Sequence, residues 1–373
     1  MSNLFIGLMS GTSLDGVDGV LCDFGADGPA AVQVLTHVHR PFDPALAAEL
    51  LALNSSGTDE LHRAALAGNS LARLYGTVVS DLLHKVGISA SAVRAIGAHG
   101  QTVRHRPGEF DGTGYTLQLN SPALLAELCG IDVVADFRSR DVAACGQGAP
   151  LVPAFHRAVF GREGETVAVL NLGGIGNLTA ILPDGRTIGF DCGPGNALMD
   201  HWCSLHRGAP FDRNGSWAET GNVDTALLQR MQADPFFHKS PPKSTGRDLF
   251  NAAWLQRAID AGPTSTDPTD IQATLAELTA WAAAEAISHH APGVSRVRVC
   301  GGGALNGHVM RLIASRLGTA SVLPTDIEGL PAGEVEAAAF AWLAKAFVDR
   351  RPGNLVAVTG AAGPRILGAL YPA

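Results

Sequence analysis

Lysine is scarce in this sequence, and no run of basic residues occurs. Lys and Arg total 27 against 35 for Asp and Glu, which gives a net charge of -8 at pH 7. Nucleic-acid-binding proteins usually present a basic face or stripe, so we expect no nucleic-acid partner. An anionic small molecule would need a local pocket of Arg, Lys and backbone N–H groups. The four lysines are Lys85, Lys239, Lys243 and Lys345.

The cysteines are few and scattered. None of the six forms a Cys-x-x-Cys pair or has a His partner at zinc-finger spacing. No stretch approaches the roughly 20 apolar residues that span a bilayer, and the N-terminus lacks the basic start and apolar region of a signal peptide. We therefore expect a soluble cytoplasmic protein with reduced thiols and no membrane partner.

The common nucleotide-binding loops are also missing. The chain contains no Gly-Lys pair, which excludes a Walker A loop. Two glycine series resemble the dinucleotide fingerprint, but they reach Thr179 and Asn306 where its third glycine belongs. A nucleotide site in this chain must therefore be built in another way.

The length of 373 residues favours two domains with a ligand cleft between them. Short strand-like segments alternate with helix-like segments, which is typical of α/β proteins. Two strand–turn–strand units, at 4–24 and 166–182, suggest two related halves. We expect residues 1–133 with about 350–373 to form one domain and about 134–349 to form the other.

Apolar spacing and capping residues predict several helices. Residues 60–86 and about 334–349 carry apolar groups at helical spacing. Thr269 to Gln272 fits a capping box that opens an Ala-rich helix to about His290. The stretch 208–248 has the Gly, Pro, Asn and Ser content of a loop, and a loop of this length is often functional.

The first Gly-rich turn carries small residues, hydroxyls and two carboxylates. Small residues let backbone N–H groups approach phosphate oxygens, and the carboxylates of Asp15 and Asp18 suit Mg²⁺ directly or through its waters. A plain β-hairpin with a polar turn is the alternative. The candidate phosphate-binding residues are Gly11, Thr12, Ser13, Leu14, Asp15, Gly16, Val17 and Asp18.

Two later Gly-rich turns extend this pattern. The second turn could face the first across a cleft and clamp the β- and γ-phosphates from the opposite side. The third lies between a strand and a helix N-terminus, where a nucleotide could lie flat. Three unrelated tight turns are the alternative. The residues are Gly173, Gly174, Gly176 and Asn177 in the second turn, and Gly301, Gly302, Gly303 and Asn306 in the third.

Asp191 is the candidate for chemistry. It follows a short strand at 187–190 and precedes a Gly-Pro-Gly turn that opens a helix, so its carboxylate would lie at the rim of a sheet. Phosphoryl transfer often uses a carboxylate that accepts a proton from the attacking oxygen. The alternative is that Asp191 only caps the turn.

Other polar residues have a functional and a plain interpretation. His99 and Gln101 lie in a dense polar segment that either contacts substrate or forms a hydrogen-bonded turn. Lys243 and Arg247 could supply the counter-charge for an acidic sugar or lie on a solvated loop. Glu336 is a lone carboxylate on an apolar helix and either faces solvent or is placed for a purpose.

Together these motifs resemble the anhydro-N-acetylmuramic acid kinase family. The resemblance runs from residue 5 to about residue 372, and its first and fourth motifs are highly specific. The motifs are Gly7-Leu-Met-Ser-Gly-Thr-Ser-Leu-Asp-Gly-Val-Asp18, Gly97-Ala-His-Gly-Gln-Thr102, Asn171-Leu-Gly-Gly-Ile-Gly-Asn177, Asp191-Cys-Gly-Pro-Gly-Asn196 and Pro242-Lys-Ser-Thr-Gly-Arg247.

The resemblance implies a fold and a reaction. The fold is the actin-like, hexokinase-like one, with a mixed five-stranded sheet flanked by helices in each domain and a cleft between the domains. The reaction converts 1,6-anhydro-N-acetylmuramic acid, ATP and water into N-acetylmuramic acid 6-phosphate and ADP, in cell-wall recycling. O6 is locked in the anhydro bridge until the C1–O6 bond breaks, so the base must activate water.

The resemblance also implies residue roles. Asp191 would be the base that activates water for attack at C1, and Glu336 would assist at the sugar. The first two turns would hold phosphates and Mg²⁺, and Gly301 to Asn306 would lie near the adenosine. His99, Gln101, Asn196, Lys243 and Arg247 match positions expected at the substrate. The family also implies a homodimer.

The sequence departs from the family pattern at two places. Cys192 stands where Thr is common, beside the implied base, and could alter its hydrogen bonding. Asn120-Ser121-Pro122 replaces the more usual Gly-Asp-Pro and affects only a helix cap. Neither departure removes a group that the implied mechanism needs.

Two other functions fit part of the pattern. A conventional sugar kinase would keep the fold but phosphorylate a free hydroxyl, without adding solvent oxygen at C1. A nucleotide-gated sensor or chaperone-like switch would use the same ATP site. It would usually add a DNA-binding or peptide-binding domain, which this sequence does not show.

Overall fold

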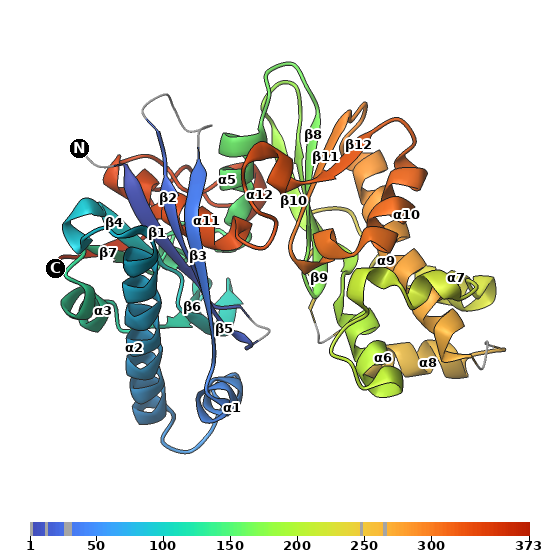
Figure 1. Cartoon of the computed structure of the whole chain (residues 1–373), viewed down its shortest axis with the longest axis horizontal. Helices are drawn as coiled ribbons and strands as arrows, with labels where there is room; N and C mark the ends of the chain where they lie inside the picture. The colour runs from blue at the N-terminus through green and yellow to red at the C-terminus, as the bar shows by residue number, and fades with distance from the viewer. Residues whose placement is uncertain (1–2, 12–13, 26–31, 247–248, 264–266) are drawn as a thin grey trace. The chain divides into compact units, whose positions relative to one another are not determined.

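The computed structural model describes residues 3–11, 14–25, 32–246, 249–263 and 267–373 (Figure 1). The chain divides into two compact units, Met1–Val159 with Glu334–Ala373 and Phe160–Gly333. Within the described residues, no helix has the length and apolar character needed to cross a membrane. Thr12, Ser13 and Arg247 lie outside the described residues.

The first unit contains a six-stranded sheet in the order β13-β7-β4-β1-β2-β3. The first three strands form an antiparallel meander, and β4 and β7 continue the sheet parallel to β1. A separate two-stranded ribbon pairs β5 with β6. The strands are β1 (Leu4–Met9), β2 (Gly16–Asp23), β3 (Gln33–Pro41), β4 (Ala95–Ala98), β5 (Gln101–Pro107), β6 (Gly114–Leu119), β7 (Val133–Ala135) and β13 (Ala369–Tyr371).

Helices cover both faces of this sheet. Leu8 pairs with Gly19 in register, and a Cβ at Gly19 would contact Val78 of α2, whereas a Cβ at Gly7 would meet the backbone of α11. Successive strand residues point to opposite faces, so α2 and α11 lie on opposite sides. The helices are α1 (Pro44–Ala52), α2 (Glu60–Val86), η1 (Ala90–Ala92), α3 (Pro122–Cys129), α4 (Ser139–Val142), α5 (Val152–Phe160), α11 (Val335–Val348) and α12 (Val356–Thr359).

The second unit contains a five-stranded sheet in the order β10-β9-β8-β11-β12. Again three antiparallel strands are followed by two strands parallel to the first. The elements are β8 (Val167–Leu172), β9 (Ile175–Ile181), β10 (Thr187–Pro194), α6 (Ala197–Arg207), η2 (Arg213–Gly215), η3 (Ala218–Thr220), α7 (Thr225–Gln232), α8 (Ala252–Asp260), α9 (Pro268–His290), β11 (Arg296–Cys300), η4 (Gly302–Leu305), α10 (Gly307–Leu317), β12 (Ser321–Pro324) and η5 (Thr325–Glu328).

The two sheets repeat one topology, and this confirms the predicted α/β fold of two related halves. In each unit a three-stranded meander begins with a strand that also pairs in parallel with the next strand of the sheet. This is the arrangement of the actin-like fold. The first sheet differs from the expected five strands because the short C-terminal strand β13 adds antiparallel to β7.

The unit boundaries differ from the sequence-based expectation. Residues 134–159 and 334–349, which we expected in the second domain, belong to the first compact unit. Strand β7 pairs with β4, and α11 packs against β1 and β4. Strand pairing and helix packing therefore place both segments in the first unit. Their composition alone does not predict this placement.

Glycines in the first sheet allow α11 an unusually close approach. A Cβ on Gly7 would overlap the carbonyl oxygen of Ala337 and lie 2.7 Å from the nitrogen of Ala341. A Cβ on Gly97 would overlap the carbonyl oxygen of Phe340. The backbone of α11 therefore rests directly on β1 and β4.

Two local predictions need correction. The cap of α9 is Asp267, whose carboxylate accepts from the Thr269 N–H at 2.8 Å, and not the predicted box from Thr269. The stretch 208–248, expected as a loop, contains α7, which Asp224 caps by accepting from the Leu227 N–H. The buried residues Leu227, Leu228 and Met231 have the spacing of one helix face.

Candidate active site

In the first unit, the residues that follow β1 are bound to those that follow β4. The Ser10 hydroxyl donates to the Gly100 carbonyl at 3.1 Å and lies 3.1 Å from the Tyr75 hydroxyl. The Tyr75 hydroxyl also accepts from the Gly100 N–H. The Gln101 amide donates to the Gly11 carbonyl at 3.1 Å. The start of the first Gly-rich turn is therefore fixed by a buried polar network.

The predicted phosphate-turn residues lie at the start of β2. Leu14 has a φ of 58°, a left-handed conformation that reverses the chain direction. Asp15 is exposed, and Gly16 begins β2. The Val17 side chain is fully buried in the core, so only its backbone is available to a nucleotide.

Asp18, a predicted metal ligand, faces two histidines of β3. Its Oδ1 atom lies 2.8 Å from His37 Nε2 and 3.1 Å from His39 Nδ1. Burial would raise the pKa of Asp18, but the two imidazoles outweigh burial and lower this pKa. The Asp18 hydrogen bond raises the pKa of His37. Among the described residues, no cluster of three His, Cys, Asp or Glu side chains forms a metal cage.

His99, predicted to bind substrate, lies in the interior with only 5% of its surface exposed. Its Nε2 atom accepts from Arg138 Nε at 3.1 Å and is 3.0 Å from Arg138 Nη2. Burial, and next the charge of Arg138, hold the pKa of His99 well below its usual range. His99 is therefore a neutral acceptor that orients an arginine.

Glu336, the second predicted catalytic carboxylate, lies in the first turn of α11 and is exposed. Phe340, one turn further along α11, packs against His99 with ring centroids 4.6 Å apart. It also packs against Phe137, the neighbour of Arg138, at 5.7 Å. Because residues four apart share a helix face, Glu336 belongs to the face of α11 that meets His99 and Arg138.

In the second unit, the second Gly-rich turn is bound to the loop after β10. Asn196 N–H donates to the Gly173 carbonyl at 2.8 Å, and Gly195 N–H donates to Gly174 at 3.0 Å. The Asn196 side chain donates to the Leu172 carbonyl at 2.9 Å. The turn itself comprises only Gly173 and Gly174, because Gly176 and Asn177 already belong to β9.

A row of polar residues crosses the second sheet at one level. Cys300 of β11 pairs with Asn171 of β8, Asn171 pairs with Asn177 of β9, and Asn177 pairs with Asp191 of β10. Directly opposite residues in neighbouring strands point to the same face. The predicted base and the predicted phosphate-turn residue Asn177 are therefore side by side.

Asp191 lies inside β10, at an irregularity between Asp191 and Gly193, and not after the strand as we expected. Its backbone N–H donates to the Lys243 carbonyl at 3.1 Å, and its Oδ2 atom accepts from the Thr245 N–H at 2.9 Å. Burial raises the pKa of Asp191 to about 6, although the Thr245 hydrogen bond opposes this. Such a carboxylate can accept a proton near neutral pH.

The hydrogen bond of Cys192 goes to the backbone and not to the carboxylate beside it. Its thiol donates to the Gly176 carbonyl at 3.1 Å, and burial raises the pKa of Cys192 to about 12. The thiol remains protonated at neutral pH and connects β10 to β9. Although Cys192 departs from the family pattern, its thiol binds the Gly176 carbonyl and not an oxygen of Asp191.

Lys243, predicted to bind substrate, directs its ammonium group toward its own unit. Nζ donates to the carbonyls of Phe236 and Phe237 at 3.2 and 3.3 Å. It also lies 4.7 Å from the centroid of the Phe236 ring. Burial lowers the pKa of Lys243. Asp191 is therefore bound by the backbone of residues 243–245, whereas the ammonium group of Lys243 binds other carbonyls.

The third Gly-rich turn follows β11, as predicted. Gly301 has a φ of 78°, and a Cβ there would lie against Asn171 and Leu172, so glycine is required. The Asn306 side chain caps α10 by accepting from the Val309 N–H at 3.1 Å. Gly302 and Gly303 begin the short helix η4, and both lie close to the side chain of Asn196.

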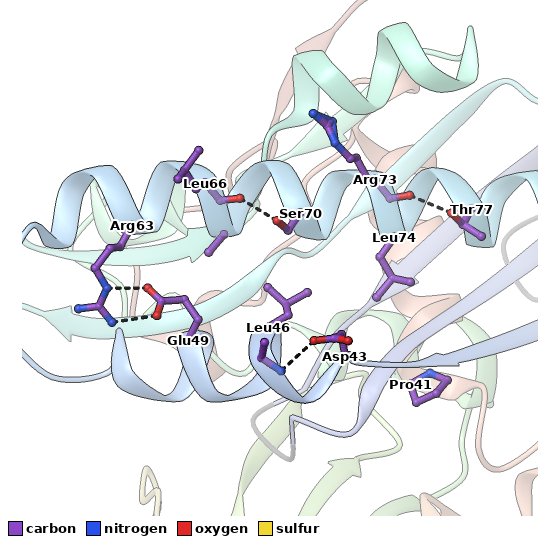
Figure 2. A pocket seen from close by; sticks show the side chains of 12 residues that line it. Pro41, Asp43, Leu46, Glu49, Arg63, Leu66, Ser70, Arg73, Leu74 and Thr77 are labelled. Carbon is purple, nitrogen blue, oxygen red and sulfur yellow. Dashed lines mark hydrogen bonds and ion pairs between the residues drawn. The ribbon is translucent and has the colours of Figure 1, made fainter.

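A groove of the first unit contains none of the predicted site residues. It lies between α1 and α2, and Figure 2 shows Leu46 and Leu74 inside it with the Glu49–Arg63 ion pair at one end. Aliphatic side chains and the Glu49–Arg63 salt bridge line it, and the hydrogen bond from Arg63 lowers the pKa of Glu49. It therefore offers no catalytic group.

Sequence reasoning missed Arg138, and it missed the contact of Thr245 with Asp191. Arg138 comes shortly after β7, and the end of a parallel strand is a usual place for ligand-binding residues. That rule could have identified it. The contact of Thr245 with Asp191 joins residues far apart in sequence, and no local pattern reveals it.

Two sheets of this topology, Gly-rich turns at strand ends and a partly buried carboxylate of raised pKa are features of ATP-dependent sugar kinases of the actin-like class. The profile of the anhydro-N-acetylmuramic acid kinase family matches residues 3–373. The chain belongs to this family.

Relatives with this family name cover the whole chain. The anhydro-N-acetylmuramic acid kinase of Variovorax paradoxus is 61% identical, with 99% of each chain covered. That of Cupriavidus metallidurans is 57% identical, with 100% of this chain and 98% of the relative covered. A glucokinase of Streptomyces griseus, solved with glucose and AMPPNP, is 16% identical over 91% of this chain and 99% of its own, with a TM-score of 0.39.

Proposed function

We propose that this protein is an ATP-dependent kinase that opens 1,6-anhydro-N-acetylmuramic acid with water and transfers the γ-phosphoryl group to O6. The products are N-acetylmuramic acid 6-phosphate and ADP, as in peptidoglycan recycling. Family membership over residues 3–373 supports the substrate. The observation that carries the chemistry is the carboxylate of Asp191, whose pKa is raised to about 6 by burial.

Asp191 is the general base in this proposal. O6 carries no proton while it is part of the anhydro bridge, so the group that must lose a proton is the attacking water. Asp191 accepts that proton as water attacks C1, the C1–O6 bond breaks, and O6 takes the phosphoryl group from ATP. The Thr245 N–H on Oδ2 keeps the carboxylate in one orientation, which leaves Oδ1 for the water.

The other site residues bind and orient the reactants. Gly11 to Asp18 and Gly173 to Asn177 hold the phosphates, and Gly301 to Asn306 lie at the adenosine. Glu336 assists at the sugar. Gln101 has a buried side-chain oxygen without a partner among the described residues, so this oxygen can accept from a sugar hydroxyl or amide.

Asp15 and Asp18 fit a Mg²⁺ ion that is shared with ATP. Mg²⁺ is usually held by one or two carboxylates, together with water and substrate phosphates, and not by a protein cage. When bound, it would neutralise charge on the β- and γ-phosphoryl groups. His37 and His39 hold the carboxylate of Asp18 in place. We further propose that the enzyme is a cytoplasmic homodimer, as the family implies.

Product analysis with two sugars tests this function. With Mg-ATP, we expect ADP release with 1,6-anhydro-N-acetylmuramic acid and a 6-phosphorylated product. We expect kcat/KM to be at least roughly a hundred-fold lower with N-acetylglucosamine, because this sugar has neither the strained C1–O6 bond nor the lactyl group. A preference for the free sugar would instead identify a conventional sugar kinase.

The pKa of Asp191 predicts the acid limb of the pH profile. The base works only as a carboxylate, so protonation below its pKa removes activity. We expect kcat/KM to be level above about pH 6 and to fall by about ten-fold per pH unit below it. A limb near pH 4, the range of an unperturbed aspartate, would show that Asp191 is not the titrating base.

A further inference from the structure

Arg138 lies at the edge of the first sheet where the parallel strands end. Ser10 directly follows β1 and His99 directly follows β4, while Arg138 comes shortly after β7. These three strands are parallel neighbours, so their carboxyl ends share one edge of the sheet. Ligands of open α/β sheets bind at this edge.

The guanidinium group of Arg138 is held in one position. It donates from Nε and Nη2 to His99 and from Nη1 to the Gly148 carbonyl at 2.9 Å. Gly148 is fixed in turn by the fully buried Asp141, which accepts from the Gly148 N–H at 2.8 Å. Asn354 and Thr359 also donate to Asp141, at 2.7 and 2.8 Å.

The hydrogen-bond partners of Arg138 are neutral, although its guanidinium is a cation. A guanidinium has five N–H groups, and those of Arg138 that have acceptors bind an imidazole nitrogen and a carbonyl oxygen. Burial lowers the pKa of Arg138 to about 10, and the charges of Glu336 and Asp141 oppose this from a distance. The Asp141 carboxylate itself accepts from Gly148, Asn354 and Thr359.

One N–H group on each terminal nitrogen is left without an acceptor among the described residues. These two groups can form the forked donor that matches a carboxylate in a bidentate pair. Arg138 is partly exposed, so a ligand can reach these two N–H groups, and an anionic ligand is their natural complement. The fixed orientation of the fork lowers the cost of binding this ligand.

We propose that Arg138 binds the lactyl carboxylate of the sugar substrate. This inference rests on the proposed function and deepens it, because the lactyl group distinguishes a muramic acid from a glucosamine. Of the two cations expected from the sequence, Lys243 donates to the carbonyls of Phe236 and Phe237, and Arg247 lies outside the described residues. The other anion of the reaction, the γ-phosphoryl group of ATP, can also pair with a guanidinium, and the test separates the two.

The test compares two substrates in two proteins. The substrates are 1,6-anhydro-N-acetylmuramic acid and the same sugar with its carboxylate converted to the amide. The proteins are the wild type and Arg138→Met, with Arg140→Met as matched control, since Arg140 is an exposed arginine on the same segment. For Arg138→Met we expect kcat/KM to fall about 10- to 100-fold with the acid and by less than about three-fold with the amide.

Further measurements keep the proposal falsifiable. Arg138→Lys retains the charge without the fork, so it should recover part of the activity with the acid. It also replaces Arg138→Met if that variant shows no melting transition. Equal losses with acid and amide would overturn the proposal in favour of a purely structural Arg138. A raised KM for ATP with an unchanged acid-to-amide ratio would overturn it in favour of the γ-phosphoryl group. Failure of the wild type to phosphorylate the acid would contradict the proposed function itself.

Discussion

Asp191→Asn should lower kcat by about 10² to 10⁴, the usual range for loss of a general base. The amide is nearly isosteric with the carboxylate and can still accept from the Thr245 N–H, which lies 2.9 Å from Oδ2 in the wild type. It cannot accept a proton from water. ATP binding should remain nearly unchanged, because the phosphate turns do not depend on this charge. The measurement is single-turnover kinetics together with ATP titration of the variant.

Asp184→Asn is the matched control for this prediction. Asp184 is an exposed aspartate in the turn between β9 and β10, where it binds Arg186. Its replacement should leave kcat within about two-fold of the wild type, since exposed ion pairs contribute little. If Asp191→Asn retained near-normal turnover, another group would have to be the base.

Gly7→Ala and Gly97→Ala should each destabilise the first unit by about 3 kcal/mol or more. The new methyl group would overlap backbone atoms of α11, at Ala337 and at Phe340 respectively. Backbone in the middle of a packed helix cannot move aside as a flexible side chain can, and overpacking at such sites is costly. A loss of this size corresponds to a fall in Tm of roughly 6 to 12 °C, which calorimetry can detect.

Gly76→Ala provides the control for added volume. Gly76 lies within α2, and a Cβ there would be 3.6 Å from Leu128, an ordinary contact distance. Alanine favours helix over glycine by about 1 kcal/mol, so Gly76→Ala should leave Tm unchanged or raise it. Wild-type stability of both strand variants would mean that α11 does not rest on the sheet as closely as the structure shows.

The strands and Gly-rich turns could be predicted from sequence because their signals are local. Residues 60–86 carry a helical repeat of apolar groups and form α2 with those bounds. The turn at Gly301 has a positive φ and no room for a Cβ atom, and glycine is the residue that satisfies both conditions. The strand expected before the third Gly-rich turn forms β11 (Arg296–Cys300).

The unit boundaries and parts of the site could not be predicted because they depend on distant contacts. Gly7 reads as an ordinary strand glycine until α11, more than 300 residues later, is placed against it. The direction of the Lys243 side chain depends on the carbonyls of Phe236 and Phe237. The polarity of the segment leaves open whether His99 contacts substrate or forms a turn, and the bond between its ring nitrogen and Arg138 depends on a residue 39 positions away.

The most direct test of the central claim is the fate of solvent oxygen. The enzyme is incubated with Mg-ATP and 1,6-anhydro-N-acetylmuramic acid in ¹⁸O-water, and the sugar product is analysed immediately by mass spectrometry. Attack of water at C1 with transfer of phosphate to O6 predicts N-acetylmuramic acid 6-phosphate with one ¹⁸O atom, at C1. A phosphorylated sugar without solvent oxygen, or ADP release without this product, would contradict coupled hydrolysis and phosphorylation.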